Sequence, residues 1–227
     1  MKLRFIAAMT LGAGLLPGLL SAADAPERLQ AATDSLKEVM DTPDKSIPQD
    51  LLDRAQCIVI VPGLKKGAFF VGAKYGKGFV SCRREGGVGW SAPGSIRVEG
   101  GSFGVQFGGS ETDVFMLVMN KKGMDRLLST KFTLGGDASV AMGPVGRSAQ
   151  AETDAALTAE ILTWSRQRGL FAGVSLSGAT LREDSDWNQD LYGKKITNRE
   201  IIVKSAVSAP KGADQLISEL NRYSSRK

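Results

Sequence analysis

The stretch from Cys57 to Met119 constrains the fold more than any other part of the chain, because its apolar residues come in short runs separated by glycine. Runs of this length, bounded by turn-forming residues, are typical of strands. Phe103, Val105 and Phe107 alternate with small or polar residues, which is the period-two pattern of a half-buried strand. The 27 glycines of the 227-residue chain also favour tight turns and twisted strands. We therefore expect strands at 58–61, 68–73, 79–82 and 114–119, with a hairpin turn at 74–77.

Amphipathic helices are predicted on both sides of this stretch. Residues 27–40 and 213–223 place apolar side chains at helical spacing, and Thr197 and Glu200 have capping-box spacing. The whole pattern predicts an α+β fold with a glycine-rich antiparallel β-sheet core, barrel-like or sandwich-like, flanked by amphipathic helices. Shorter predicted elements are helices at 48–56 and 124–130, a strand at 159–165, and a turn at 167–169 that leads back into 170–177.

The first 23 residues have the pattern of a cleavable secretory signal, followed by a single domain over residues 24–227. Lys2 and Arg4 form a positive n-region, an apolar stretch follows, and Ser21-Ala22-Ala23 supplies the small residues that a signal peptidase recognises. Glycine and proline interrupt the apolar stretch. A membrane span needs about 20 continuous apolar residues, and this stretch is too short and too interrupted to provide them. An uncleaved anchor is the alternative. We expect cleavage near Ala23 and a periplasmic or secreted protein.

Cys57 and Cys82 are the only cysteines of the chain. In an oxidising compartment they can pair if their Cα atoms lie within about 7 Å of each other. Such a bond would stabilise the fold by about 3 kcal/mol. Two buried free thiols are the alternative.

The chain contains no histidine, which excludes Ser-His-Asp and Cys-His catalysis and histidine-ligated zinc. The run of Asp184, Asp186, Asn188 and Asp190 has the spacing of a calcium-binding loop, but glutamine stands where that loop needs glycine and Lys195 where it needs glutamate. We interpret it as a polar turn. Carboxylates such as Glu111 and Asp113 are expected to be solvated surface charges. The sequence thus predicts no enzyme activity, no metal site and no cofactor.

The net charge of the chain is weakly positive. The chain carries 29 basic and 24 acidic residues, and loss of Lys2 and Arg4 with the leader reduces the net charge from +5 to +3. This excess is too small to indicate nucleic-acid binding. Basic residues cluster at predicted turns beside aromatic ones, a mixture suited to anionic lipid head groups. The expected lipid-binding residues are Lys65, Lys66, Phe69, Phe70, Lys74, Lys77, Lys121, Lys122, Arg166 and Arg168.

From Ile47 to Tyr192 the chain resembles the SYLF domain, a lipid-binding family of bacteria and eukaryotes. Six motifs in order carry the resemblance, although none is diagnostic alone. They are IPQDLLDRAQCIVIVPGLKKGAFFVGAKYGKG at 47–78, WSAP at 90–93, GGSFGVQFGG at 100–109, GPVGR at 143–147, GLFAGVSLSG at 169–178, and Asn188 with Tyr192-Gly193.

The resemblance implies a compact α+β domain that binds membrane lipids and has no established catalytic activity; some eukaryotic members also contact actin. In those members lipid binding is associated with an N-terminal amphipathic helix and nearby basic residues, which correspond here to residues 27–40 and to Lys65 and Lys66. Residues 24–45, however, carry three basic and six acidic side chains, a poor anchor for an anionic bilayer. We therefore expect this helix to pack on the domain and the basic turns to contact lipid.

The predicted function is non-enzymatic binding of anionic membrane phospholipids. The alternative is a protein–protein interaction or structural role in the cell envelope. Because the protein is expected outside the cytoplasm, actin is predicted to be an unlikely partner.

Overall fold

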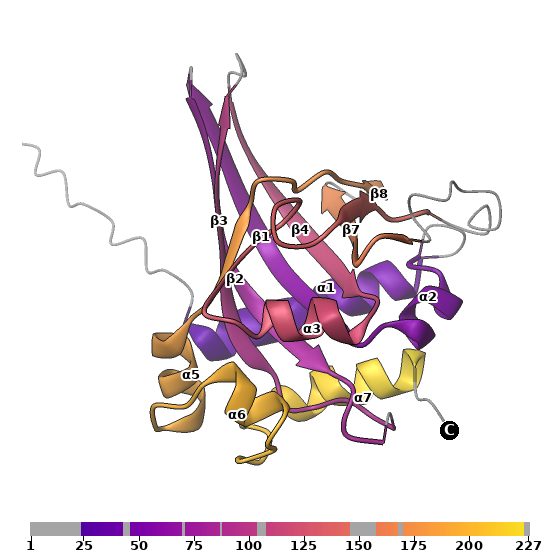
Figure 1. The fold of residues 1–227 in the computed structure, drawn as a ribbon, viewed down its shortest axis with the longest axis vertical. Coiled ribbons are helices and arrows are strands. Elements are labelled where there is room, and N and C mark those ends of the chain that lie inside the picture. Colours follow the sequence, from indigo (N-terminus) through magenta and orange to yellow (C-terminus); the bar gives the residue numbers. More distant parts are fainter. Residues whose placement is uncertain are drawn as a thin grey trace, which may run out of the picture.

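The computed structural model describes residues 24–42, 46–69, 71–86, 88–103, 108–145, 158–167 and 170–224 (Figure 1). The predicted secretory signal, residues 1–23, lies outside these ranges, and so do Phe70 and Arg168.

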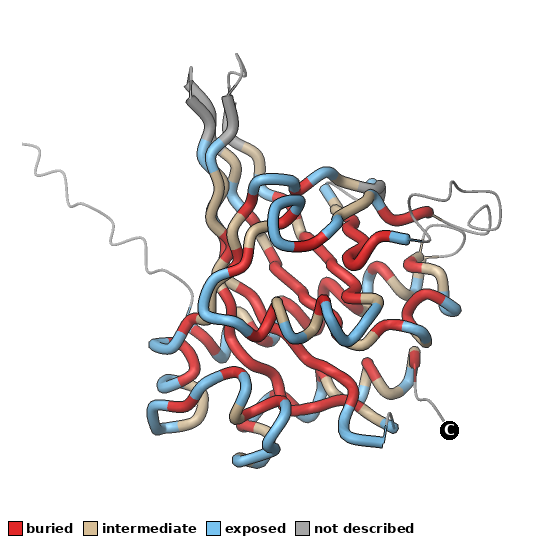
Figure 2. The backbone as a smooth tube through the Cα atoms, viewed as in Figure 1, coloured by how far each residue is buried: buried red, intermediate tan, exposed pale blue. Residues whose placement is uncertain are grey.

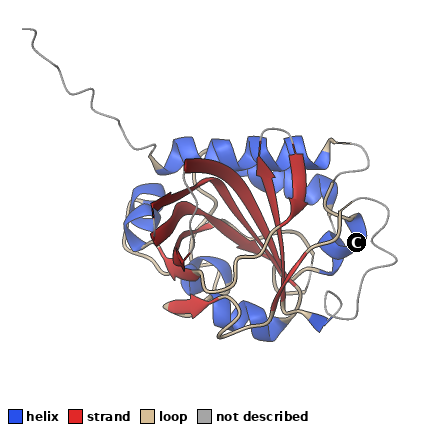
Figure 3. Cartoon of the chain, turned by 90° about the horizontal axis from the view of Figure 1, so that it is seen from above, coloured by secondary structure: helices blue, strands red, loops and turns tan. Residues whose placement is uncertain are grey.

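The described strands form one curled sheet in the order β5-β9-β3-β2-β1-β4-β7-β6, with β8 paired to β7 beside β6 (Figures 1 and 3). Every pairing is antiparallel except that of β6 with β7. The predicted α+β fold with an antiparallel core is confirmed. The strands are β1 (Cys57–Phe69), β2 (Val71–Cys82), β3 (Gly94–Phe103), β4 (Gly108–Val118), β5 (Lys131–Thr133), β6 (Val140–Met142), β7 (Ile161–Gln167), β8 (Leu170–Gly173) and β9 (Thr180–Glu183).

Helices lie on both sides of the sheet (Figure 3). Those predicted near the two ends of the chain are confirmed, and Thr197 and Glu200 form the predicted capping box. The helix expected at 124–130 begins three residues earlier, where the Asn120 side chain accepts a hydrogen bond from the Gly123 amide. The helices are α1 (Ala25–Met40), α2 (Gln49–Arg54), α3 (Lys121–Leu127), α5 (Ser185–Tyr192), α6 (Asn198–Ile202) and α7 (Ala213–Tyr223).

Both faces of the sheet are buried at its lower end, shown in red in Figure 2. On β1, Ile58 and Ile60 pack in a core shared with α1, α2 and α7, whereas Val59 and Val61 pack in a second core on the opposite face. We call these the helix-side face and the concave face. Because both are apolar, the strand reads as a continuous hydrophobic run.

A β-bulge at Pro62 and Gly63 interrupts the pairing of β1 with both neighbouring strands. Proline has no N–H to donate, and Gly63 has a positive φ of 61°, a conformation that glycine adopts without strain. Side chains replace the missing strand partners. Arg28 of α1 donates to the Pro62 carbonyl at 3.0 Å, and Asp113 of β4 accepts from the Gly63 amide at 2.9 Å.

Two details of the strand prediction are wrong. Residues 68–73 are not one strand, since β1 ends at Phe69 and β2 begins at Val71. Residues 74–77 are not a turn but lie inside β2, paired with both β1 and β3. Lysine and glycine suggested a turn there, but Gly76 is buried beneath Leu64 and Lys77 packs on Trp187 as parts of the strand. The strand predicted at 159–165 corresponds to β7, and β8 returns antiparallel to it as expected.

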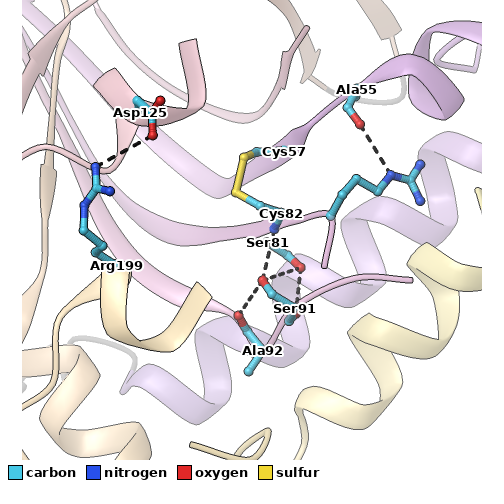
Figure 4. Close-up of a disulfide and its surroundings, with 9 residues drawn as sticks. Ala55, Cys57, Ser81, Cys82, Ser91, Ala92, Asp125 and Arg199 are labelled. Carbon is cyan, nitrogen blue, oxygen red and sulfur yellow. Dashed lines mark hydrogen bonds and ion pairs between the residues drawn. A yellow bond between two sulfur atoms is a disulfide. The ribbon is translucent and has the colours of Figure 1, made fainter. Parts of the chain in front are cut away.

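Cys57 and Cys82 lie directly opposite each other on β1 and β2 and are joined by a disulfide (Figure 4). Both are fully buried in the core of the concave face. Beside them, the hydroxyl of Ser81 donates to the Ser91 carbonyl at 2.8 Å, and the Cys82 amide donates to the Ser91 hydroxyl at 3.1 Å. The disulfide therefore joins the first residue of β1 to the last residue of β2, and the hydrogen bonds of Ser91 attach the segment that leads into β3. In the described part of the chain, no helix is both long and apolar enough to cross a membrane.

Candidate functional site

The upper halves of β1 to β4 extend beyond the helices as a four-stranded arm, formed by residues 65–69, 71–75, 99–103 and 108–111 (Figure 1). The tube in Figure 2 changes from buried to intermediate and exposed as the strands enter the arm. Four of the predicted lipid-binding residues, Lys65, Lys66, Phe69 and Lys74, lie here.

Strand register sorts these lysines onto different faces. Lys66 lies opposite Lys74 of β2 and opposite Ser110 of β4, so the three side chains share a face. It is the concave face, because Leu64, two residues before Lys66, is buried in that core. Lys65 lies opposite Glu111 on the helix-side face. Burial lowers the pKa of the Lys66 ammonium, and the positive charge of Lys74 lowers it further.

A second group of basic residues surrounds α3. We call it the α3 groove, a hollow of about 830 Å³. Lys122 and Arg126 both pair with Glu160, at 3.4 and 2.8 Å. Lys121 and Lys131 have no ion pair among the side chains that the structure describes. The groove is lined by Lys121, Lys122, Asp125, Arg126, Ser129, Lys131, Phe132, Gly136 and Asp137.

Other predicted lipid-binding residues already have partners within the protein. Lys77 forms an ion pair with Asp184 at 2.9 Å, and its ammonium lies 4.4 Å from the ring centre of Trp187. Arg166 donates to Asp113 at 2.7 Å and also pairs with Glu38 of α1. The structure thus uses Lys77 and Arg166 to join elements of the fold. Phe70 and Arg168 lie outside the described residues, and Phe69 is placed only as the last residue of β1.

Asp113 differs from the surface charge that we expected. Its side chain is 18% exposed and accepts from both Arg166 and the backbone of the β1 bulge. Through Arg166 it is linked to Glu38, so one carboxylate connects β1, β4 and β7 with α1. Glu111 is exposed, as predicted.

The acidic run near residue 184 is also helical, not a turn. Asp184 caps α5 by accepting from the Trp187 amide at 3.2 Å. Asn188 is buried and donates to Asn198 at 2.8 Å, whereas Asp186 and Asp190 are exposed. Within the described ranges, no three Cys, Asp or Glu side chains are grouped so that they could hold a metal ion.

Sequence reasoning missed Arg126 and Lys131 as members of the α3 groove. Arg126 follows Lys122 by four residues, the spacing that places two side chains on one helix face, so the sequence did contain this signal. Lys131 comes from the neighbouring strand β5, and only the tertiary fold brings it to α3. The Ser129 hydroxyl in this groove is directed to the backbone carbonyls of Arg126, at 2.6 Å, and Lys131, at 2.9 Å. The groups of the groove that are suited to binding anions are therefore the Lys121 and Lys131 ammonium groups.

Comparison with known proteins gives a consistent result. Residues 99–223 match the family model Ysc84, described as "Las17-binding protein actin regulator". Over 179 residues, 77% of this chain, it is 37% identical to an SH3 domain-containing protein of Schizosaccharomyces pombe, of which it covers 41%. It is 36% identical over 178 residues to Protein YSC84 of Saccharomyces cerevisiae, covering 37% of that protein and 77% of this chain. SH3 domain-containing YSC84-like protein 1 of Xenopus laevis is 31% identical over 185 residues, 81% of this chain and 55% of the relative.

These comparisons overturn one prediction. Actin was expected to be an unlikely partner, but the matching family is described as an actin regulator and relatives are named for Las17 binding. The prediction rested on the expected export of the chain, which says nothing about the surface of the domain. The chain spans about two fifths of the length of the yeast relatives that it matches.

Proposed function

This chain belongs to the Ysc84 family, the SYLF family of the sequence resemblance, and on that premise we propose that it is a non-enzymatic module that binds anionic phospholipid. Residues 24–227 act as one unit, and the lipid contact is peripheral.

The observation that carries this proposal is the α3 groove. It gathers three lysines and an arginine around one hollow, and two of the lysines, Lys121 and Lys131, lack an ion pair among the described side chains. Each basic residue near an anionic surface contributes about 1 kcal/mol to binding. The amphipathic helix α1 does not compete for this role, since Leu29, Leu36 and Val39 are buried against the sheet.

Vesicle co-sedimentation tests the proposal. The protein is expected to pellet with vesicles of phosphatidylcholine and phosphatidylglycerol at low salt, but not with phosphatidylcholine alone. The double variant Lys121→Gln/Lys131→Gln should weaken the partition by about thirtyfold, from two lost contributions of about 1 kcal/mol. The variant Lys194→Gln/Lys195→Gln removes the same charge from exposed residues outside the groove and should bind normally. If the wild-type protein does not pellet with anionic vesicles at low salt, the proposal is wrong.

A second candidate is binding to actin or to an actin-regulating protein, which the family description favours. Co-sedimentation with filamentous actin, in the absence of lipid, separates the two functions. A complex that survives detergent and high salt points to protein–protein interaction, because electrostatic attachment to lipid is screened under those conditions.

We also propose that the protein is exported and cleaved near Ala23. The signal-like leader and the paired Cys57 and Cys82 support this proposal, because disulfides persist in oxidising compartments. N-terminal sequencing of the protein from its native host should begin at or near Asp24. A protein that retains Met1 in the cytoplasmic fraction would contradict export.

A further inference from the structure

Lys66 and Lys74 form a like-charged pair on the concave face of the arm. They lie directly opposite each other on β1 and β2, and residues opposite each other in antiparallel strands have Cβ atoms about 5 Å apart. Lysine side chains that start this close on one face bring like charges together, and these repel each other unless a negative charge lies nearby.

The sheet provides no such charge on this face. In β1 to β4, the described side chains that share the face are apolar, glycine, serine or threonine, apart from the two lysines. The carboxylates of the same strands, Glu99, Glu111 and Asp113, alternate onto the helix-side face. Glu99 pairs there with Arg97 and Asp113 with Arg166. Among the described side chains of these four strands, the carboxylates therefore lie on the helix-side face, and the concave face carries two cations with no carboxylate of the sheet beside them.

The surroundings of the lysine pair are small and polar. Across the four strands the row reads Gly100, Lys74, Lys66 and Ser110. Gly100 has no side chain to cover Lys74, and the Ser110 hydroxyl is an additional donor beside Lys66. Below the pair, Leu64 is packed over Gly76, where a Cβ atom would lie 2.7 Å from the leucine. The pair therefore lies at the polar rim of the concave core.

We propose that Lys66 and Lys74 together bind a phosphate group at this rim, with Ser110 as a third donor. A tetrahedral oxyanion accepts from both ammonium groups at once and supplies the charge that the face lacks. The source of the phosphate is either a soluble phosphate ester or the head group of a phosphomonoester lipid. The site is separate from the α3 groove, and it does not depend on membrane binding through that groove.

The ionisation of Lys66 agrees with such a site. Its pKa is lowered by burial and by Lys74, and both causes are reversed by a bound anion, which favours the protonated amine. Its neighbours within the sheet on this face are Lys74 on β2, Ser110 on β4 and Leu64 on β1, and of these three only Lys74 is charged.

The proposal can be tested by NMR titration of the full-length protein labelled with ¹³C-lysine. Inorganic phosphate should raise the titration midpoint of Lys66 by about one pH unit, in the range expected for an opposite charge within hydrogen-bonding distance. Chloride at the same ionic strength should not. Lys65 is the matched control, since it is the next residue along β1 but faces Glu111 on the other side. Its midpoint should not respond to phosphate.

Two further experiments identify the source of the phosphate and exclude indirect effects on Lys66. A response to inorganic phosphate supports a site for soluble esters, and a response only to vesicles containing phosphatidic acid supports the same site with a lipid ligand. The variant Lys74→Gln should abolish the response of Lys66, whereas Lys65→Gln should leave it intact. If Lys66 responds to neither probe, or responds equally in Lys74→Gln, the proposal is wrong. Loss of vesicle binding in the α3 groove variant leaves this result unchanged, so the two proposals fail separately.

Discussion

The two halves of β1 show how one strand serves two purposes. From Cys57 to Val61 each side chain is at most 1% exposed, because the helix-side and concave cores cover both faces. Beyond the bulge at Pro62 and Gly63, Lys65 is exposed and Lys66 only half-buried, although the strand remains paired with β2 and β4. We call the covered region, where residues 57–61 lie, the body of the sheet. Backbone pairing is thus similar in both halves, and the difference lies in what covers the faces.

This comparison indicates a division of labour. Apolar burial in the body provides most of the stability, since hydrophobic burial is the main favourable term in folding. The arm contributes little burial and is free to display charges. Substitutions in the body should therefore change stability, whereas substitutions in the arm should change binding.

The largest expected effect is that of Phe115→Ala. Phe115 lies on β4 in the helix-side core and is fully buried. Its truncation should lower the free energy of unfolding by about 3–5 kcal/mol, because the transfer energy is lost and a cavity remains. Urea unfolding followed by circular dichroism measures the change.

The matched arm variant is Tyr75→Ala. Tyr75 is an aromatic residue of β2 with 47% of its surface exposed, and its replacement should change the free energy of unfolding by no more than about 0.5 kcal/mol. Equal losses for the two variants would show that the arm supports the fold as much as the body does.

The second prediction concerns the disulfide at the body end of β1 and β2. Replacing Cys57 and Cys82 together by alanine should cost about 3 kcal/mol, because the bond closes a loop with a sequence separation of 25 residues. Unfolding with and without reductant measures this difference in the wild type. An unchanged midpoint on reduction would show that the bond does not stabilise the body.

The contrast between body and arm also explains what could be predicted from the sequence. Apolar runs revealed the body strands at Ile58 to Val61 and after Val114, and helical spacing revealed α1 and α7. Residues 74–77, where β2 passes from the arm into the body, were misread, because lysine and glycine are also typical of turns. The strand was predicted to end at Val61, before Pro62, because proline is normally excluded from paired strands except at bulges.

The candidate site was harder to predict for a different reason. Sequence proximity suggested Lys65 and Lys66 as equivalent neighbours, but strand alternation places them on opposite faces. From the sequence, Lys77 and Arg166 were predicted to be free to bind lipid. In the structure they form ion pairs with Asp184 and Asp113. Charge pairing between distant segments is a tertiary property, and no local pattern encodes it.

A third prediction concerns Lys77, which belongs to β2 just below the arm. Asp184 caps α5 and holds Lys77, so Asp184→Ala should lower the free energy of unfolding by about 1–2 kcal/mol. Asp184→Asn retains an oxygen that can accept from the Trp187 amide and loses only the charge, so its effect should be smaller. Thermal unfolding of both variants measures the difference. If the asparagine variant loses as much as the alanine variant, the ion pair to Lys77 and not the cap is the important contact.

The smallest expected effect is at the rim of the helix-side face, where the Tyr223 hydroxyl of α7 donates to Asp41 at the end of α1 at 2.7 Å. Burial, followed by the hydrogen bond to Asp41 and the charge of Asp41, raises the pKa of Tyr223 from 10.0 to about 12. The folded state therefore favours the protonated phenol. Its contribution to stability is complete below pH 10 and is lost as the pH rises towards 12.

Tyr223→Phe should cost no more than about 1 kcal/mol at pH 8, the net value of one hydrogen bond at a partly exposed position. The gap between variant and wild type should narrow between pH 10 and 12 in urea unfolding. Burial also raises the pKa of Tyr192, but this contribution is present in both proteins and cancels in the comparison. A gap that stays constant through this range would mean that the contact between α1 and α7 depends on packing and not on the phenolic proton. Apolar packing would then stabilise the helix-side face as far as its rim, and this face would differ even more clearly from the charged arm.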